Sequence, residues 1–323
     1  METFVYRPEI TFEDTNLVGN VYFANFVRWQ NECRNDWLKA TDFHTYSQVF
    51  RRTKQLLVEE VDLQFLDPAG ATLGDVIEVV MTVQSIDHQS YRGLFEIRRL
   101  PQPGSNGGVA LLARGHQCFA FVDQKCQWRQ GGSSQSFASR SGPAFVLDVP
   151  VPLDAGRSGT QLDSLDLIRL QGKCREQFLA THAPGILAAV SAATLALHTN
   201  RVSYTLLDPA DVDPADLIRL EMRMTDLKSR LTVEFTYLLI SGRDSGASPR
   251  KIASGAQVLC CKRRNAEQQF VASVFPVAML EALVRYTDSD QLRSTIDVLL
   301  EHQSSHHKVT ASNRSTTVQS RMQ

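Results

Sequence analysis

The sequence repeats itself with a period of roughly 140 residues, and a repeat of this length predicts two copies of one structural unit. RWQNECRNDWL, which starts at Arg28, aligns with RLQGKCREQFL, which starts at Arg169, so that Cys33 is matched by Cys174. The same offset relates LDPAGATLGD to LDPADVDPAD, and a third pair, ARGHQ and ASGAQ, follows at nearly the same offset. Three collinear matches favour a duplication over chance.

The limits of the two units can be predicted from composition. A chain of 323 residues is long enough for two domains of ordinary size, each with its own core. We expect one domain over residues 1–128 and a second over residues 145–300. Residues 129–144, RQGGSSQSFASRSGPA, are rich in Gly and Ser and predict an exposed linker. Residues 301–323 are polar and predict a disordered tail.

Charge and cysteine content argue against several classes of protein. The 34 Lys and Arg residues face 35 Asp and Glu residues, so no basic field is available to hold a nucleic acid. The six cysteines form no CxxC pair and no zinc-type spacing to histidine, which predicts reduced thiols and no metal. No apolar run approaches the roughly 18 residues of a membrane helix, and the N-terminus does not resemble a signal peptide. We therefore expect a cytoplasmic protein.

Each copy predicts the same order of elements. In the first copy residues 5–12 alternate like a strand, TNLVGN suits a turn with a positive φ angle, and apolar residues recur at helical intervals from about 21 to 38. Four β-rich runs follow, at residues 56–66, 75–87, 91–100 and 109–123. The predicted fold class is α+β, with a strand, a long helix and an antiparallel meander in each copy.

With this order of elements in place, residues 9–38 carry a family signature. FEDTNLVGNVYFANFVRWQNECR resembles the active-site region of hot-dog-fold acyl thioesterases, in the enediyne polyketide branch of the 4-hydroxybenzoyl-CoA thioesterase-like superfamily. The resemblance implies a tandem double hot-dog, in which each copy is a central helix wrapped by an antiparallel sheet. The two copies would then form a pseudo-dimer within one chain.

The resemblance also implies roles for residues of the first loop and helix. In related enzymes a loop Asn and a helix Arg are proposed to act together, and here these positions hold Asn16 and Arg34. An amide has no useful basicity and a guanidinium accepts no proton, so the implied hydrolysis is base-free. The oxyanion would be bound by backbone N–H groups where the helix opens, at Gly19, Asn20 and Val21.

Further candidates surround this pair. Tyr22, Phe23 and Phe26 are expected to bind substrate, and relatives carry tyrosine where Phe26 stands. As weaker candidates, Glu60 and Asp62 offer carboxylates on one strand, and Arg175 repeats Arg34 in the second copy.

The sequence of the second copy predicts a single active site in each chain. The position equivalent to Asn16 holds Arg157, in a loop that lacks the signature, so the second copy would serve as scaffold. The expected substrate is a polyketide or polyene acyl thioester, including a β-keto chain, carried on phosphopantetheine of an acyl carrier protein or on CoA, without a cofactor. An acyl carrier protein or polyketide synthase would be the partner, and further oligomerisation stays open. The alternatives are an acyl-thioester dehydratase or hydratase and a non-catalytic acyl-binding module.

Overall fold

The structure is a computed structural model. It describes residues 2–16, 19–67, 70–102, 104, 107–123, 142–151, 162–209, 212–243, 248–267, 269–287 and 289–301. Most of the predicted linker (129–141), most of the loop around Arg157 (152–161) and nearly all of the predicted tail (302–323) lie outside these residues.

The described part of the first copy contains five strands and two α-helices. They are β1 (Glu2–Tyr6), α1 (Phe23–Thr41), α2 (Phe43–Phe50), β2 (Lys54–Phe65), β3 (Val76–Ser85), β4 (Ser90–Leu100) and β5 (Ala110–Asp123). The four predicted β-rich runs thus correspond to β2 through β5. The strand predicted over residues 5–12 is wrong beyond Tyr6, because Pro8 has no N–H to donate and Phe12–Asp14 form a 3-10 helix.

The second copy repeats this order and adds elements at its end. They are β6 (Phe145–Pro150), α3 (Ser164–His182), α4 (Pro184–Ser191), β7 (Leu195–Leu206), β8 (Leu217–Leu227), β9 (Leu231–Ile240), β10 (Arg250–Arg264), β11 (Phe270–Ser273) and α5 (Val277–Leu283). Residues 290–301 form a further helix.

One continuous antiparallel sheet joins the copies. Its strand order is β1-β3-β4-β5-β2-β7-β10-β9-β8-β6, with β11 paired to β10. The junction is the antiparallel pair of β2 and β7, in which Glu60 lies opposite Thr205 and Gln64 lies opposite Arg201. Each copy thereby covers an edge strand of the other, which removes two exposed edges. The predicted intrachain pseudo-dimer is confirmed.

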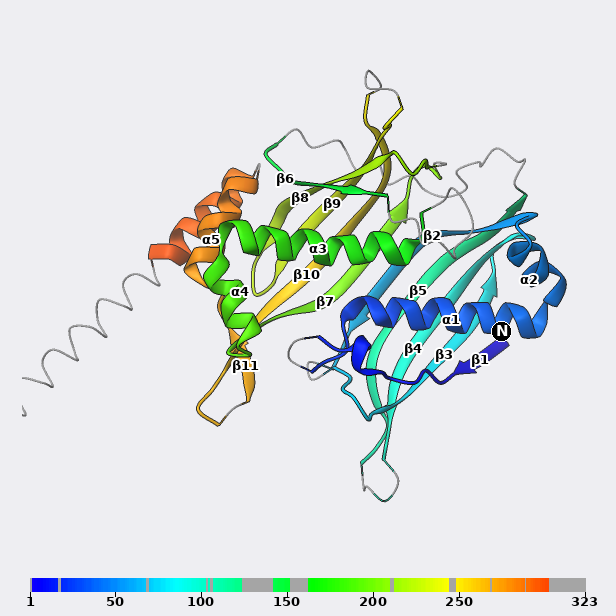
Figure 1. Cartoon of the computed structure of the whole chain (residues 1–323). Coiled ribbons are helices and arrows are strands. Elements are labelled where there is room, and N and C mark those ends of the chain that lie inside the picture. Colours follow the sequence, from blue (N-terminus) through cyan, green and yellow to red (C-terminus); the bar gives the residue numbers. More distant parts are fainter. Residues whose placement is uncertain are drawn as a thin grey trace, which may run out of the picture.

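Both central helices cover the same face of this sheet (Figure 1). Alternate residues of the strands point toward them, so that Ile77, Val79 and Met81 of β3 are fully buried. From α1 the side chains of Trp29 and Cys33 are likewise fully buried. A helix packed on a curved antiparallel sheet in each of two fused copies is the double hot-dog predicted from the sequence.

Helix α1 begins two residues later than its apolar pattern predicts. Asn20 and Val21 form isolated β-bridges with Thr72 and Thr15, and Tyr22 still has extended backbone angles (φ −66°, ψ 136°). The chain turns before this point at Gly19, whose φ of +83° is the positive angle that the TNLVGN segment predicts. The loop before α1 is therefore held by β-bridges on both sides, and the helix itself begins at Phe23.

Helix α3 packs closely against the start of α1 at Gly172. A Cβ atom at this position would overlap the hydroxyl oxygen of Tyr22 from the other copy. Asn31 occupies the equivalent place in the first copy, so the repeat itself does not require glycine. Gly172 is therefore what lets Tyr22 lie between the copies.

Replacing Gly172→Ala should lower the free energy of unfolding by about 1–3 kcal/mol, since overpacking forces neighbours to shift. Tyr22→Phe removes the overlapping oxygen and should restore part of the loss, although a ring carbon remains 3.0 Å from the added Cβ. Urea unfolding of the two single variants and the double variant measures the coupling. Additive losses would mean that Tyr22 is not the obstacle.

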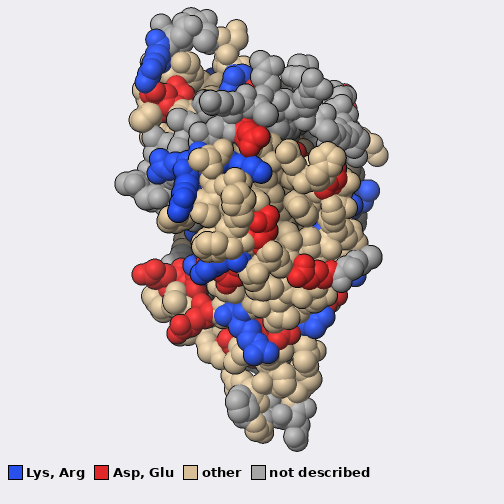
Figure 2. Space-filling model, turned by 90° about the vertical axis from the view of Figure 1, so that its right-hand side faces the viewer, with Lys and Arg blue, Asp and Glu red and all other residues tan. Residues whose placement is uncertain are grey.

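The surface is mixed in charge. On the face shown in Figure 2, Lys and Arg side chains are interspersed with Asp and Glu side chains. Among the described residues, no helix has the length and apolarity needed to cross a membrane.

Candidate active site

A cavity of about 570 Å³ lies where the two copies meet. The first copy contributes its loop and the start of α1, and the second contributes α3, α4 and β7. Residues of the first copy that line the cavity include Asn16, Tyr22, Phe23, Phe26 and Phe65. Residues of the second copy that line it include Arg175, Glu176, Leu187, His198 and Thr199. Neither copy alone could form this site.

Asn16 lies in the loop at the wall of this cavity. Its Oδ1 accepts a hydrogen bond from the N–H of Asn20 at 3.1 Å, and its own backbone N–H donates to the Asn20 carbonyl at 2.7 Å. The side-chain oxygen therefore shapes the turn, as asparagine does in many loops. The Nδ2 group is the part of the amide that can donate a hydrogen bond to a substrate carbonyl.

The backbone N–H groups predicted to bind an oxyanion already donate hydrogen bonds to oxygen atoms of the protein. Gly19 donates to the Asn16 carbonyl at 2.9 Å, Asn20 donates to the Asn16 side chain, and Val21 donates to the Ala71 carbonyl at 2.7 Å. These three residues lie before α1 and are not part of its first turn. Phe23 and Ala24 supply the first two N–H groups of α1, and these have no acceptor within the described part of the chain. Because Phe23 lines the cavity, its N–H is a candidate donor for an oxyanion.

Arg175 provides a buried positive charge at the cavity, which the more exposed Arg169 also lines. Its Nη1 donates to Thr199 Oγ1 and to Gln257 Oε1, each at 3.1 Å, and its guanidinium lies over the Phe23 ring at 5.6 Å. These contacts fix the Nη1 side of the guanidinium group. Nε and Nη2 donate to no acceptor within the described residues, so they remain available to an oxygen in the cavity.

Arg34, the predicted partner of Asn16, is not among the residues that line this cavity. It is buried on the far part of α1, where its Nη1 donates to Asn31 Oδ1 at 3.1 Å and Gln117 Oε1 at 2.9 Å. Burial lowers its pKa to about 10, which still leaves it cationic at neutral pH. The structure therefore brings Asn16 together with Arg175, and it holds Arg34 in an internal network.

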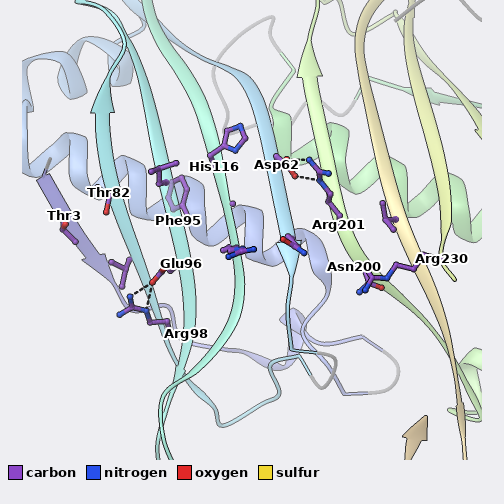
Figure 3. A pocket seen from close by; sticks show the side chains of 16 residues that line it. Thr3, Asp62, Thr82, Phe95, Glu96, Arg98, His116, Asn200, Arg201 and Arg230 are labelled. Carbon is purple, nitrogen blue, oxygen red and sulfur yellow. Dashed lines mark hydrogen bonds and ion pairs between the residues drawn. The ribbon is translucent and has the colours of Figure 1, made fainter. Parts of the chain in front are cut away.

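The two weaker carboxylate candidates lie on the other face of the sheet, away from α1 and α3. Asp62 forms an ion pair with Arg201 across the junction of the copies, and it lines a groove on that outer face (Figure 3). Glu60 contacts His116, with 3.3 Å between Oε1 and Nε2. Between them, Val61 is fully buried on the helix side, as strand alternation requires.

His198 is a cavity residue that sequence reasoning did not select. It lies on β7 with its ring 6.5 Å from that of Phe65, and burial lowers its pKa to about 4. Lys262 and Arg175 lower the pKa further, while Asp67 opposes them. The imidazole is thus neutral at ordinary pH. The equivalent position of the first copy holds Leu57, and a polar residue in only one copy is the signal that could have identified His198.

Two carboxylates also reach the cavity wall. Glu13 comes from the loop of the first copy and Glu176 follows Arg175 on α3, and both residues are exposed. Sequence reasoning did not select them. They are the carboxylates of the cavity wall that a base-assisted mechanism would use, so they provide a direct check of any base-free mechanism.

The equivalent place in the other half of the pseudo-dimer is nearly closed. There Leu57, Leu162, Leu167 and Leu206 stand at the positions that His198, Val21, Phe26 and Phe65 hold around the open cavity. The space that they and their described neighbours enclose is about 20 Å³, too small for an acyl chain. Among the described residues, only one of the two related sites can admit a substrate.

The cysteines of the central helices are not nucleophiles. Burial raises the pKa of both Cys33 and Cys174 to about 12, so both are protonated thiols at neutral pH.

Comparison with known proteins agrees with this fold. Residues 10–152 match the family model described as "Thioesterase-like superfamily". The fold resembles an oleoyl thioesterase from Lactobacillus plantarum (10% identity, 80% of this chain and 96% of that chain, TM-score 0.55). It also resembles an acyl-ACP thioesterase from Bacteroides thetaiotaomicron (8% identity, 80% and 97%, TM-score 0.54). A dynemicin thioesterase is 28% identical over 45% of this chain and 99% of its own, with a TM-score of 0.40. No curated protein matches the chain.

Proposed function

We propose that this chain is a thioester hydrolase of the thioesterase-like superfamily, whose family model matches residues 10–152. It would release a polyketide or polyene acyl chain at the cavity between its copies. The observation that carries the proposal is the meeting of Asn16, Arg175 and the Phe23 N–H at one cavity formed by both copies. The acyl group would arrive on phosphopantetheine of an acyl carrier protein or on CoA in the cytoplasm, and no cofactor is required.

The proposed chemistry is the stabilisation of a tetrahedral oxyanion. The Phe23 N–H, at the positive end of α1, and the free side of the Arg175 guanidinium supply donors for the developing charge. Asn16 would donate its Nδ2 hydrogen to the thioester carbonyl. His198 is neutral and can orient the attacking water, but a group with a pKa of about 4 removes a proton poorly at neutral pH.

The acyl chain would extend into the second copy. Leu179, Leu187, Val190 and Leu197 form an apolar wall of the cavity there, between α3, α4 and β7. An unbranched or polyene chain placed along this wall leaves the thioester beside Asn16 and the carrier arm toward the exposed loop. The second copy thus serves as scaffold and as acyl-chain wall, while its own related site is closed.

The proposal predicts that Asn16→Asp lowers kcat/KM by roughly 100-fold, as loss of one oxyanion-hole donor does. Aspartate keeps the oxygen that accepts the Asn20 N–H, so the loop is preserved while the amide donor is lost. Hydrolysis of acyl-CoA and acyl carrier protein thioesters, followed by mass spectrometry of the products, measures the effect. Full activity in this variant would contradict the role of the Asn16 amide as a hydrogen-bond donor.

The same assay tests whether the mechanism needs a base. Glu176→Gln and Glu13→Gln should each change kcat/KM by less than about threefold, because the proposed mechanism uses neither carboxylate. A large loss of activity in either variant would indicate a carboxylate-assisted mechanism in place of the base-free one.

The product of the assay separates the other functions. Free acid indicates a thioesterase, a gain or loss of one water in the acyl chain indicates a hydratase or dehydratase, and unchanged thioester indicates a binding module.

A further inference from the structure

Three metal-ligating side chains gather on the outer face of the sheet, away from the acyl cavity. His116 and Cys118 lie two residues apart on β5 and therefore point to the same face. Glu60 on β2 is the residue directly opposite Cys118 in the ladder. One ligand atom from each of the three lies within 4.8 Å of the others.

The spacing of these atoms matches that around a zinc ion. Bonds of about 2.0 Å from zinc to nitrogen and oxygen at tetrahedral angles separate those two atoms by roughly 3.3 Å, and sulfur from oxygen by roughly 3.6 Å. His116 Nε2 is 3.3 Å from Glu60 Oε1, and Cys118 Sγ is 3.8 Å from the other carboxylate oxygen, Oε2. Binding of one zinc ion by all three residues would therefore require rotation of the side chains, which start within 4.8 Å of one another.

The cluster is accessible to an ion from solvent. The side chains of His116 and Glu60 are 25% and 42% exposed, and Cys118 is a buried residue. His116 also lines a groove of about 940 Å³ on this face of the sheet (Figure 3). A fourth, water ligand could therefore be supplied from the groove.

The fold itself does not require these ligands. At the equivalent positions of the second copy, Arg201 replaces Glu60, Ala256 replaces His116 and Val258 replaces Cys118. Arg201 and Val258 are paired in the ladder as Glu60 and Cys118 are, which confirms the correspondence. The same sheet is built there without a single metal ligand, so the cluster in the first copy is an addition to the fold.

We propose that Glu60, His116 and Cys118 form a zinc site with one open position. On binding, the Cys118 thiol loses its proton to water and the thiolate, the carboxylate and the neutral imidazole bind the ion. The two anionic ligands balance the charge of Zn²⁺. Arg92, whose Nε donates to Cys118 Sγ at 3.5 Å, would then act as an outer hydrogen-bond donor to the bound sulfur. Sequence spacing missed the site because its ligands come from two strands.

Cobalt is the probe, since Co²⁺ takes zinc sites and shows a sulfur-to-cobalt charge-transfer band when a thiolate binds. Titration of the full-length, metal-free chain should give one Co²⁺ per chain with this band, and Zn²⁺ should displace it. Because His306 and His307 lie outside the described residues and can chelate metals, the background protein carries alanine at both positions. Far-UV circular dichroism checks that each variant is folded.

Three variants and one control decide the outcome. Cys118→Ser should abolish the charge-transfer band, and His116→Ala and Glu60→Gln should each weaken Co²⁺ binding at least about tenfold. Cys260→Ser, at a partly exposed thiol of the second copy, should leave the titration unchanged. A band that survives Cys118→Ser, or a chain that binds no Co²⁺ at all, would overturn the proposal.

Discussion

Replacing Arg175→Met is expected to lower kcat/KM by roughly 100- to 1000-fold, the loss seen when an oxyanion donor is removed. Methionine keeps the apolar stem and much of the volume of arginine, so the cavity wall stays in place. What disappears is the charged guanidinium, whose Nε and Nη2 donate to no acceptor among the described residues. Steady-state hydrolysis of an acyl thioester, with kcat and KM determined separately, measures the effect.

Arg34→Met is the matched control, because the repeat provides a second buried arginine that makes an equivalent hydrogen bond but does not line the cavity. Each arginine donates its Nη1 to a glutamine of the neighbouring strand, Gln117 for Arg34 and Gln257 for Arg175. Both variants leave buried acceptors without a donor, and each should lose about 1–3 kcal/mol of stability. Only the change at Arg175 should also remove activity. Equal losses of activity in both variants would mean that these arginines act through packing.

The pairing of Asn16 with Arg34 illustrates what the sequence could not provide without geometry. Arg34 lies 11 residues beyond the start of α1 at Phe23, and a rise of 1.5 Å per residue puts it roughly 16 Å along the helix axis. The loop before the helix cannot reach so far. Helix α3 of the second copy packs beside the start of α1. Arg175 on α3 therefore lines the same cavity as the loop. The repeat predicted the pseudo-dimer but not which copy supplies the charge.

The fold was more accessible to prediction than the site. Alternation in runs such as DVIEVVMTVQSID predicts strands because one face must be buried, and β3 (Val76–Ser85) follows that pattern. The short helices α2 and α4 were not predicted, although Asp42 caps α2 by accepting the Thr45 N–H and Pro184 occupies the first turn of α4. Eight-residue helices leave too few periodic positions to stand out.

Comparison of the two copies supplies what one copy cannot. Positions that agree, such as Cys33 and Cys174, report what the shared fold buries. Positions that differ around the cavity, such as Leu57 and His198, report where the two related sites diverge. Among the described residues, the open cavity and its small counterpart differ at such positions, which agrees with the proposal that a single site acts in each chain.

Lowering the pH from about 6.5 to about 4 is expected to cost the wild-type chain roughly 3 kcal/mol of unfolding free energy through His198 alone. The folded pKa of about 4 lies below the usual value of 6.5, so between these values the unfolded chain binds the proton and the folded chain does not. Acid therefore favours unfolding over this window. Below about pH 4 both states are protonated and this contribution stops growing.

His198→Leu isolates this contribution, because Leu57 shows that leucine suits the equivalent position of the fold. Urea unfolding of both proteins at pH 7, 5.5 and 4 gives a difference in which the carboxylates common to both cancel. The unfolding free energy of the variant minus that of the wild-type protein should rise by roughly 3 kcal/mol as the pH falls from 7 to 4. A difference that does not change with pH would show that His198 is free to be protonated in the folded chain. It would then carry a second positive charge beside Arg175 in mild acid, and the neutral imidazole assigned to the cavity would be wrong.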